Sequence, residues 1–254
     1  MNTNALVNRK SSTGTEDKDE FLFWEPIAKS RWGRYISTVE ESMIRYAIRQ
    51  SPNPSMSLDI GAEGGRWSKL LCDAGWTTIC TDIKQSALDV CQQRIPTAKC
   101  ILVDKGSQTF PCEDDSIGIL LAIEVHELLE QDWFVRESAR VLKTDGLLVG
   151  VFQNACSWRA VVKNWFPDRN ESFKHYTASY RTWRRFAKQH KLEIVREKGI
   201  CWMPFGRKSD SPLIPLAVRL ERYLGLQTLT SVSPWIIFVA KKIAAAGKDD
   251  HCFG

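Results

Sequence analysis

Two carboxylates and three glycines lie within residues 57–68 of the chain (SLDIGAEGGRWS). Residues 55–60 are typical of a buried strand, and residues 67–74 have the apolar spacing of a helix. The glycines between them allow a sharp turn and a close approach of a ligand to the main chain. Asp59 and Glu63 would repel a diphosphate, but they suit a ligand that carries an ammonium and a sulfonium. The stretch therefore predicts a nucleotide-type site at the entry of a doubly wound sheet.

These residues resemble motif I of class I S-adenosylmethionine (SAM)-dependent methyltransferases, Asp-x-Gly-x-Gly-x-Gly, with Glu63 at the middle glycine. The resemblance covers about residues 34–152 and, more weakly, 176–241, and the branch includes ubiquinone- and menaquinone-biosynthesis enzymes. It implies that the chain is a methyltransferase that uses SAM and releases S-adenosyl-L-homocysteine. The loop residues that would bind the cofactor are Asp59, Gly61, Ala62, Glu63 and Gly65. A glycine turn without a ligand is the alternative, and the ordered motifs downstream favour the site.

Two further acidic residues follow predicted strands. Asp82 ends the second strand, about 20 residues after the glycine loop, where a carboxylate can accept both ribose hydroxyls. The resemblance implies that role for Asp82 and places Ile83 against the adenine; an Asp that caps the next helix is the alternative. Asp104 follows a third strand, and the resemblance implies that it bonds the adenine amino group beside Lys105.

Glu124 follows the predicted fourth strand, 117–123, at the edge of the sheet where open α/β folds bind ligands. Relatives often have Glu-Val-x-Glu-His here, and in this chain the histidine has moved to position 126. Glu124 is therefore a predicted cofactor-binding residue. Inside the fourth strand, Gly118 replaces an acidic residue that is usual in the family, which is a second departure from the pattern.

Transfer to a hydroxyl acceptor benefits from a general base, and histidine is the usual base at neutral pH. Of the four histidines, His126 follows the fourth strand, and His175 begins a His-Tyr-Thr run that relatives often carry. His126 and His175 are the candidate catalytic residues, with structural hydrogen bonding as the alternative for each. The reaction requires no metal, and no CxxC pair occurs, so we predict no metal site.

Apolar strands alternate with helical stripes along the chain, which predicts an α/β fold. The resemblance implies a Rossmann-like three-layer sandwich whose seven-stranded mixed sheet has the order 3-2-1-4-5-7-6, with strand seven antiparallel. We expect one domain over residues 21–243 between tails 1–20 and 244–254. The predicted strands are 55–60, 75–83, 99–103, 117–123, 147–152, 192–198 and 235–241. The main predicted helices are 36–50, 67–74, 86–94, 131–142, 178–190 and 212–226, the last broken near Pro215.

Composition narrows the class of protein. The 254 residues carry a net charge of +5 from 35 basic and 30 acidic residues, dispersed along the chain, so there is no basic track for nucleic acid. The N-terminal residues lack an apolar signal core, and the longest apolar runs are too short to span a membrane. The eight cysteines are expected to be reduced thiols in a cytoplasmic protein.

Three aromatic-rich segments, 21–35, 158–167 and 201–205, are expected near the carboxyl ends of the strands. They lie in predicted cap segments 21–50, 154–175 and 200–233, and together they would wall a small-molecule pocket. We therefore expect a small, apolar or aromatic acceptor, lipid-linked ones included, rather than nucleic acid. The apolar stretch 213–216 can lie on a membrane surface without insertion. A non-catalytic accessory or scaffold protein with the same fold is the alternative function, and a nicotinamide oxidoreductase is disfavoured by Asp59 and Glu63.

Overall fold

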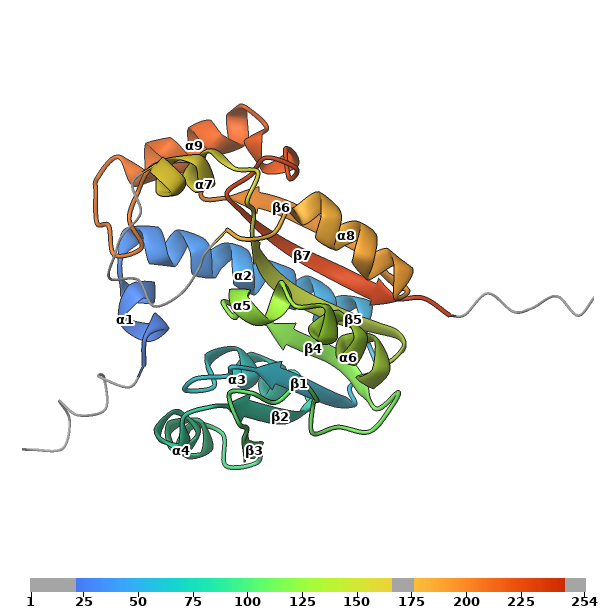
Figure 1. The fold of residues 1–254 in the computed structure, drawn as a ribbon. Coiled ribbons are helices and arrows are strands. Elements are labelled where there is room, and N and C mark those ends of the chain that lie inside the picture. Colours follow the sequence, from blue (N-terminus) through green and yellow to red (C-terminus); the bar gives the residue numbers. More distant parts are fainter. Residues whose placement is uncertain (1–21, 166–175, 245–254) are drawn as a thin grey trace, which may run out of the picture.

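A computed structural model describes residues 22–165 and 176–244. The predicted N-terminal tail, the predicted C-terminal tail from residue 245 onward, and His175 lie outside these residues. Its centre is a seven-stranded sheet with the order β3-β2-β1-β4-β5-β7-β6 (Figure 1). The strands are β1 (Met56–Ile60), β2 (Thr77–Asp82), β3 (Lys99–Leu102), β4 (Ile117–Ala122), β5 (Leu142–Gln153), β6 (Leu192–Ile200) and β7 (Trp235–Lys242). Because β7 pairs antiparallel with both β5 and β6, the predicted strand order and direction are confirmed.

Helices cover both faces of the sheet (Figure 1). The helices are α1 (Trp24–Lys29), α2 (Arg31–Gln50), α3 (Arg66–Asp73), α4 (Gln85–Arg94), α5 (His126–Leu129), α6 (Asp132–Val141), α7 (Trp158–Trp165), α8 (Tyr180–Gln189) and α9 (Ile214–Tyr223), with a 3₁₀ turn, η1 (Leu226–Thr228). None of those in the described ranges has the length and hydropathy that a membrane span needs. The alternation along the central strands divides the core: Val149 and Ile237 pack beneath α2, whereas Leu148 and Phe238 pack beneath α6 and α8.

The structure corrects the predicted helices in three places. The aromatic segment before residue 36 is helical: α1 and α2 are separated by Ser30, whose Oγ accepts a hydrogen bond from Gly33 N at 3.0 Å and caps α2. The short α5 was not predicted. Pro215 lies in the first turn of α9, where a missing N–H is tolerated, so it begins this helix rather than breaking it.

Strand β5 begins at Leu142, not at the predicted residue 147. Leu142 pairs with Ile117, and the next pair joins Leu147 to Ile119, so the predicted turn 143–146 is an irregularity inside the strand. Asp145 there has a φ of 68°, a left-handed conformation that Asp tolerates better than most residues. The predicted strand 147–152 is therefore correct, whereas the predicted turn before it is part of the same strand, which extends back to Leu142.

Gly118, one of the two departures from the family pattern, lies in β4 under the ring of Trp76. A Cβ at this position would be 2.8 Å from Trp76 Cζ3 and 2.8 Å from Ser55 Oγ. We expect Gly118→Val to lower the free energy of unfolding by about 1–3 kcal/mol, because a buried indole must move. Urea denaturation checks this, with Gly106→Val as the control, since a Cβ there has no neighbour within 4 Å. Equal stability of the two variants would contradict the packing account.

Candidate active site

The glycine loop after β1 is enclosed by neighbouring elements. Gly61 has a φ of +66°, and a Cβ there would lie 2.5 Å from Val125 Cγ1, beyond β4. Gly65 has a φ of +73°, and its Cβ would lie 2.6 Å from Cys91 Sγ on α4. Ala62 N donates to the Thr81 carbonyl at 2.9 Å and ties the loop to β2. Positions 61 and 65 therefore require glycine, because of their backbone conformation and because a side chain would have no space.

Asp59 is directed into the interior rather than toward open space. Its carboxylate is buried and accepts a hydrogen bond from Ser68 Oγ on α3 at 2.5 Å. Burial raises the pKa of Asp59 to about 7, although the bond from Ser68 opposes that shift. In this structure Asp59 fixes the start of α3 against the loop, and its contact with the cofactor stays a prediction.

Asp82 joins the end of β2 to the glycine loop. Its Oδ2 accepts from Glu63 N at 3.0 Å and its Oδ1 accepts from Lys84 N at 2.9 Å. Ile83 beside it leaves 52% of its surface exposed. Asp104 and Lys105 are exposed just after β3. The four residues predicted for the nucleoside therefore follow two neighbouring strand ends, as the resemblance implied.

Glu63, the other departure from the family pattern, binds the start of α1. Its carboxylate accepts hydrogen bonds from the backbone N–H groups of Phe23 and Trp24, the latter at 3.1 Å. Burial raises the pKa of this carboxyl, and the two N–H groups counteract the rise. An ion pair between Glu25 and Arg94 joins the same helix to α4. Glu63 thus holds α1 over the glycine loop, which a glycine at this position would not do.

Glu124 is the centre of a buried chain of proton-sharing groups. It follows β4 with a φ of 61°, and its Oε2 lies 2.7 Å from His126 Nε2. His126 Nδ1 lies 3.2 Å from the Val151 carbonyl, which can only accept, so Nδ1 carries the proton. On the other side Glu124 makes a hydrogen bond with Glu40 of α2. These contacts join α2, β4 and β5 at one point.

Burial decides where the protons of this chain lie. It raises the pKa of Glu40 well above its usual range, and it raises that of Glu124 to about 7. The buried Oε1 atoms of the two carboxyls have no other donor, so a hydrogen bond between them needs a proton on one carboxyl. Burial favours Glu40 as the group that holds this proton, although Arg66, 3.3 Å from Glu40 Oε2, opposes it. Burial lowers the pKa of His126 to about 3. The contact between Glu124 and the neutral His126 therefore contains one proton.

This arrangement bears on the predicted bases. Both ring nitrogens of His126 are occupied inside the protein, so it can accept a proton from an acceptor only after one of these contacts opens. His175 lies outside the described residues. The two histidines stay predictions, as does cofactor binding by Glu124. Glu40 was not predicted; the signal was a carboxylate within the apolar stripe formed by Ile36, Met43 and Ala47.

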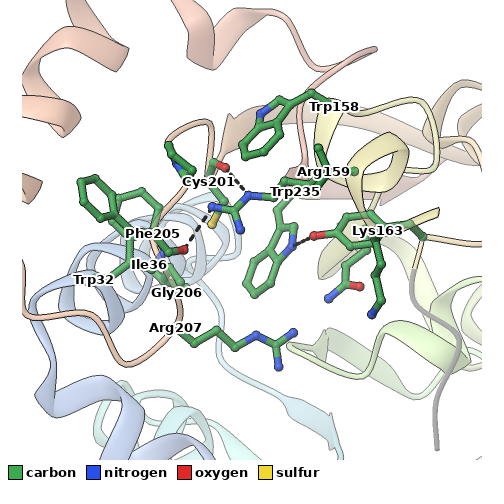
Figure 2. A pocket seen from close by; sticks show the side chains of 14 residues that line it. Trp32, Ile36, Trp158, Arg159, Lys163, Cys201, Phe205, Gly206, Arg207 and Trp235 are labelled. Carbon is green, nitrogen blue, oxygen red and sulfur yellow. Dashed lines mark hydrogen bonds between the residues drawn. The ribbon is translucent and has the colours of Figure 1, made fainter. Parts of the chain in front are cut away.

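A cavity of about 610 Å³ lies beside the buried hydrogen-bonded group of Glu40, Glu124 and His126. Each of the three predicted aromatic segments contributes to its wall, through Trp32, Trp158 and Phe205, so the aromatic-lined cavity expected from the sequence is present (Figure 2). Trp235 forms another part of the wall, and its ring centroid lies 5.4 Å from that of His126. The Trp235 Nε1–H donates to Tyr176 Oη at 3.0 Å. Trp235 thus lies between the cavity and the buried hydrogen-bonded group that contains His126.

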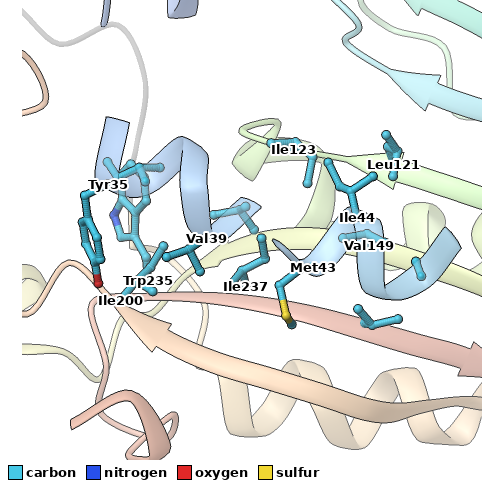
Figure 3. Packing of buried hydrophobic residues seen from close by; sticks show 14 of the residues in the cluster. Tyr35, Val39, Met43, Ile44, Leu121, Ile123, Val149, Ile200, Trp235 and Ile237 are labelled. Atoms are coloured by element: carbon cyan, nitrogen blue, oxygen red, sulfur yellow. The ribbon is translucent and has the colours of Figure 1, made fainter. Parts of the chain in front are cut away.

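The core fixes the α2 wall of the cavity. Figure 3 shows Val39, Met43 and Ile44 of α2 packed toward Val149 and Ile237 of the sheet. Those five side chains are at most 5% exposed, so the helix cannot rotate without opening the core. Because of this packing, α2 holds its cavity-lining and buried polar side chains in fixed positions.

Three thiols lie together beneath the loop. The sulfur atoms of Cys80, Cys91 and Cys100 are within 4.8 Å of one another. A hydrogen bond with Cys91 and burial raise the pKa of Cys80, and burial raises that of Cys100. Metal ligation requires thiolates, which these environments disfavour. All cysteines in the described residues are free thiols.

Comparison with known proteins decides the class. The family model described as a methyltransferase domain matches residues 58–150, which run from β1 through the glycine loop and Glu124 to β5. The chain carries a class I SAM-dependent methyltransferase domain. Its cofactor is SAM, and the residues predicted to bind SAM stay predictions. No curated protein sequence matches the chain.

Solved structures share the fold of this methyltransferase domain at low sequence identity. A candidate sarcosine dimethylglycine methyltransferase from Galdieria sulphuraria is 17% identical, with a TM-score of 0.58, covering 89% of this chain and 98% of that one. Geranyl diphosphate C-methyltransferase from Streptomyces coelicolor is 11% identical, with a TM-score of 0.55 and coverages of 82% and 80%. A candidate methyltransferase in complex with the Haloferax volcanii Trm112 methyltransferase activator is 14% identical, with a TM-score of 0.55, covering 80% of this chain and 89% of that one.

Proposed function

We propose that this methyltransferase transfers the methyl group of SAM to a small, largely apolar or aromatic acceptor bound in the cavity. The observation that carries the proposal is the position of the cavity. Three aromatic segments line it, and Trp235 in its wall lies against His126, which follows β4. Ligands of open α/β sheets bind at this edge. Two of the solved structures that share this fold are of enzymes named geranyl diphosphate methyltransferases, whose substrate is a small molecule.

The bound cofactor supplies an already activated methyl group. The work left to the protein is to align the acceptor with it and to exclude water. In this proposal Asp82 accepts hydrogen bonds from the ribose hydroxyls, and Ile83 packs against the adenine. The aromatic side chains of the cavity displace water from the acceptor, and Glu63 keeps α1 closed over the loop. His126 could take a proton from an acceptor hydroxyl only if its contact with Glu124 opened and the change raised its pKa from about 3.

Asp82 carries the nucleoside part of the proposal. We expect Asp82→Ala to weaken SAM binding by about 1.5–3 kcal/mol, because a charge-assisted hydrogen bond to the ribose is lost. Isothermal titration calorimetry measures the change. Asp73→Ala is a matched control, since Asp73 pairs with Lys69 on the exposed face of α3. Unchanged SAM affinity in a folded Asp82→Ala variant would remove Asp82 from the site.

Methyl transfer itself is tested with radiolabelled SAM. Purified protein is incubated with small-molecule extracts of the source organism and, separately, with tRNA and total protein. The proposal predicts label in an extractable apolar or aromatic product. Transfer to tRNA that exceeds transfer to every small-molecule fraction would contradict it.

A non-catalytic accessory protein is the second candidate. The carboxylate of Glu63 at a family glycine favours it, because that side chain joins the loop to α1. The neighbour that binds the Trm112 activator is compatible with a function inside a complex. SAM affinity separates the two candidates, since an accessory protein of this kind needs none.

A further inference from the structure

The guanidinium of Arg207 lies between two indole rings at the cavity. Its central carbon is 5.2 Å from the ring centroid of Trp24 and 5.1 Å from that of Trp235. Arg207 lines the cavity and is half-buried, and Figure 2 shows its side chain extending beneath Trp235. Within residues 22–165 and 176–244, its guanidinium makes no hydrogen bond and no ion pair. The N–H donors of this guanidinium therefore have no protein acceptor among the described residues.

Arg159, which lines the same cavity, shows the contrast. Its Nε donates to the Cys201 carbonyl at 3.0 Å, and its Nη2 donates to the carbonyls of Met203 and Phe205. These bonds hold the loop before α9 against α7, so the Arg159 guanidinium is committed to the protein. The Arg207 guanidinium makes no such hydrogen bonds to the described residues, although Arg207 lies on the same loop.

Glu124 is close enough to feel the charge of Arg207 but does not neutralise it. Arg207 counteracts the rise in the pKa of Glu124, yet the two make no ion pair within 4.0 Å. The Glu124 carboxyl is already engaged by Glu40 and His126. The partly buried Arg207 cation has two indole rings as neighbours and no carboxylate partner in the described part of the chain, so an anion in the cavity would gain a charge-assisted contact there.

We propose that the acceptor carries an anionic group, a carboxylate or a phosphate, that binds Arg207. The planar guanidinium fork matches either group bidentately. The apolar body of the same molecule would then extend along Trp32, Phe205 and Trp158. This inference rests on the proposed function, and it narrows the substrate class from apolar molecules to apolar anions.

The test uses matched aromatic probes: 2-naphthoate, 2-naphthyl phosphate and the neutral 2-naphthamide. Each is titrated calorimetrically into the protein with and without saturating S-adenosyl-L-homocysteine. At least one anion is expected to bind about tenfold or more tightly than the amide, and the tighter anion identifies the preferred group. Arg207→Gln is expected to abolish the preference, and Arg207→Lys to retain part of it. Lys208→Gln, an adjacent exposed cation that does not line the cavity, is expected to leave it unchanged.

Two results would overturn the inference. The first is equal binding, or no binding, of the anions and the amide to the wild-type protein. The second is a tenfold or greater loss of S-adenosyl-L-homocysteine affinity in Arg207→Gln with an unchanged urea midpoint, which would assign Arg207 to the cofactor carboxylate. Wild-type binding of S-adenosyl-L-homocysteine without an anion preference refutes only the anionic acceptor. An anion preference without cofactor binding refutes the proposed function instead.

Discussion

Gly61→Ala is expected to lower SAM affinity by about 100-fold or more. The new Cβ would lie 2.5 Å from Val125 Cγ1, in a backbone conformation with a φ of +66°. The left-handed conformation alone costs about 1–2 kcal/mol for a residue with a side chain. The clash then displaces either the glycine loop or the segment that holds Glu124, and both belong to the proposed cofactor site. Calorimetric titration with SAM gives the affinity, and urea denaturation gives the stability.

Gly75→Ala is the matched control for this prediction. Gly75 also has a positive φ, +89°, but a Cβ there meets its nearest neighbour, Pro54, at 3.6 Å, an ordinary contact. It should lose stability through backbone strain and keep its SAM affinity. If both variants bound SAM as the wild type does, the glycine loop would not be the cofactor site.

Glu124→Ala is expected to lower the free energy of unfolding by about 2–5 kcal/mol, because the buried Glu40 and His126 each lose one hydrogen-bond partner and keep only Arg66 and the Val151 carbonyl. Glu124→Gln should cost less than about 1 kcal/mol. Its amide oxygen can accept from Glu40, and its NH₂ can donate to the neutral His126. Chemical denaturation at pH 7 separates the two variants. Equal losses would show that an amide cannot replace the carboxyl between Glu40 and His126.

The same group makes stability depend on pH. The pKa of Glu124 is raised to about 7 in the folded protein, from an ordinary value near 4, so the folded state binds the proton more tightly than the unfolded state. This contribution is present below the unfolded pKa and is lost as the pH rises through about 7. Its size is on the order of 3 kcal/mol. Glu40, His126 and the cations Arg66 and Arg207 act on Glu124, so the test compares slopes rather than absolute values.

Urea midpoints measured from pH 5 to pH 9 provide that comparison. The wild-type protein should lose more stability over this range than Glu124→Gln, which has no proton to release at this position. Parallel pH profiles would mean that Glu124 does not hold its proton as described.

The sheet and the positions of the nucleoside-binding candidates could be predicted because they depend on local order. Asp82 follows an apolar strand about 20 residues after the glycine loop, and a parallel sheet brings such strand ends to one edge. The interior direction of Asp59 and Glu124 could not be predicted in the same way. Their partners, Ser68 and Glu40, come from helices whose rotation about their own axes is set by the packed core.

Contacts between distant segments account for the other differences. The start of α1 depends on Glu63, 39 residues away from Trp24, so no local pattern marks it. Arg207 acquires its place between Trp24 and Trp235 only when α1, the loop before α9 and β7 come together. By contrast, Pro215 carried a local signal that fits either a helix break or a helix start, and its position in the first turn decides between them.

A crystal structure of the protein with S-adenosyl-L-homocysteine is the most direct test of the central claim, that the cofactor and the acceptor cavity meet at the carboxyl end of β4. The account predicts the ribose hydroxyls on Asp82, the adenine against Ile83 and the sulfur directed toward the cavity beside Trp235. A folded protein that shows no bound nucleoside at saturating concentration, or one that binds it away from the glycine loop, would contradict it.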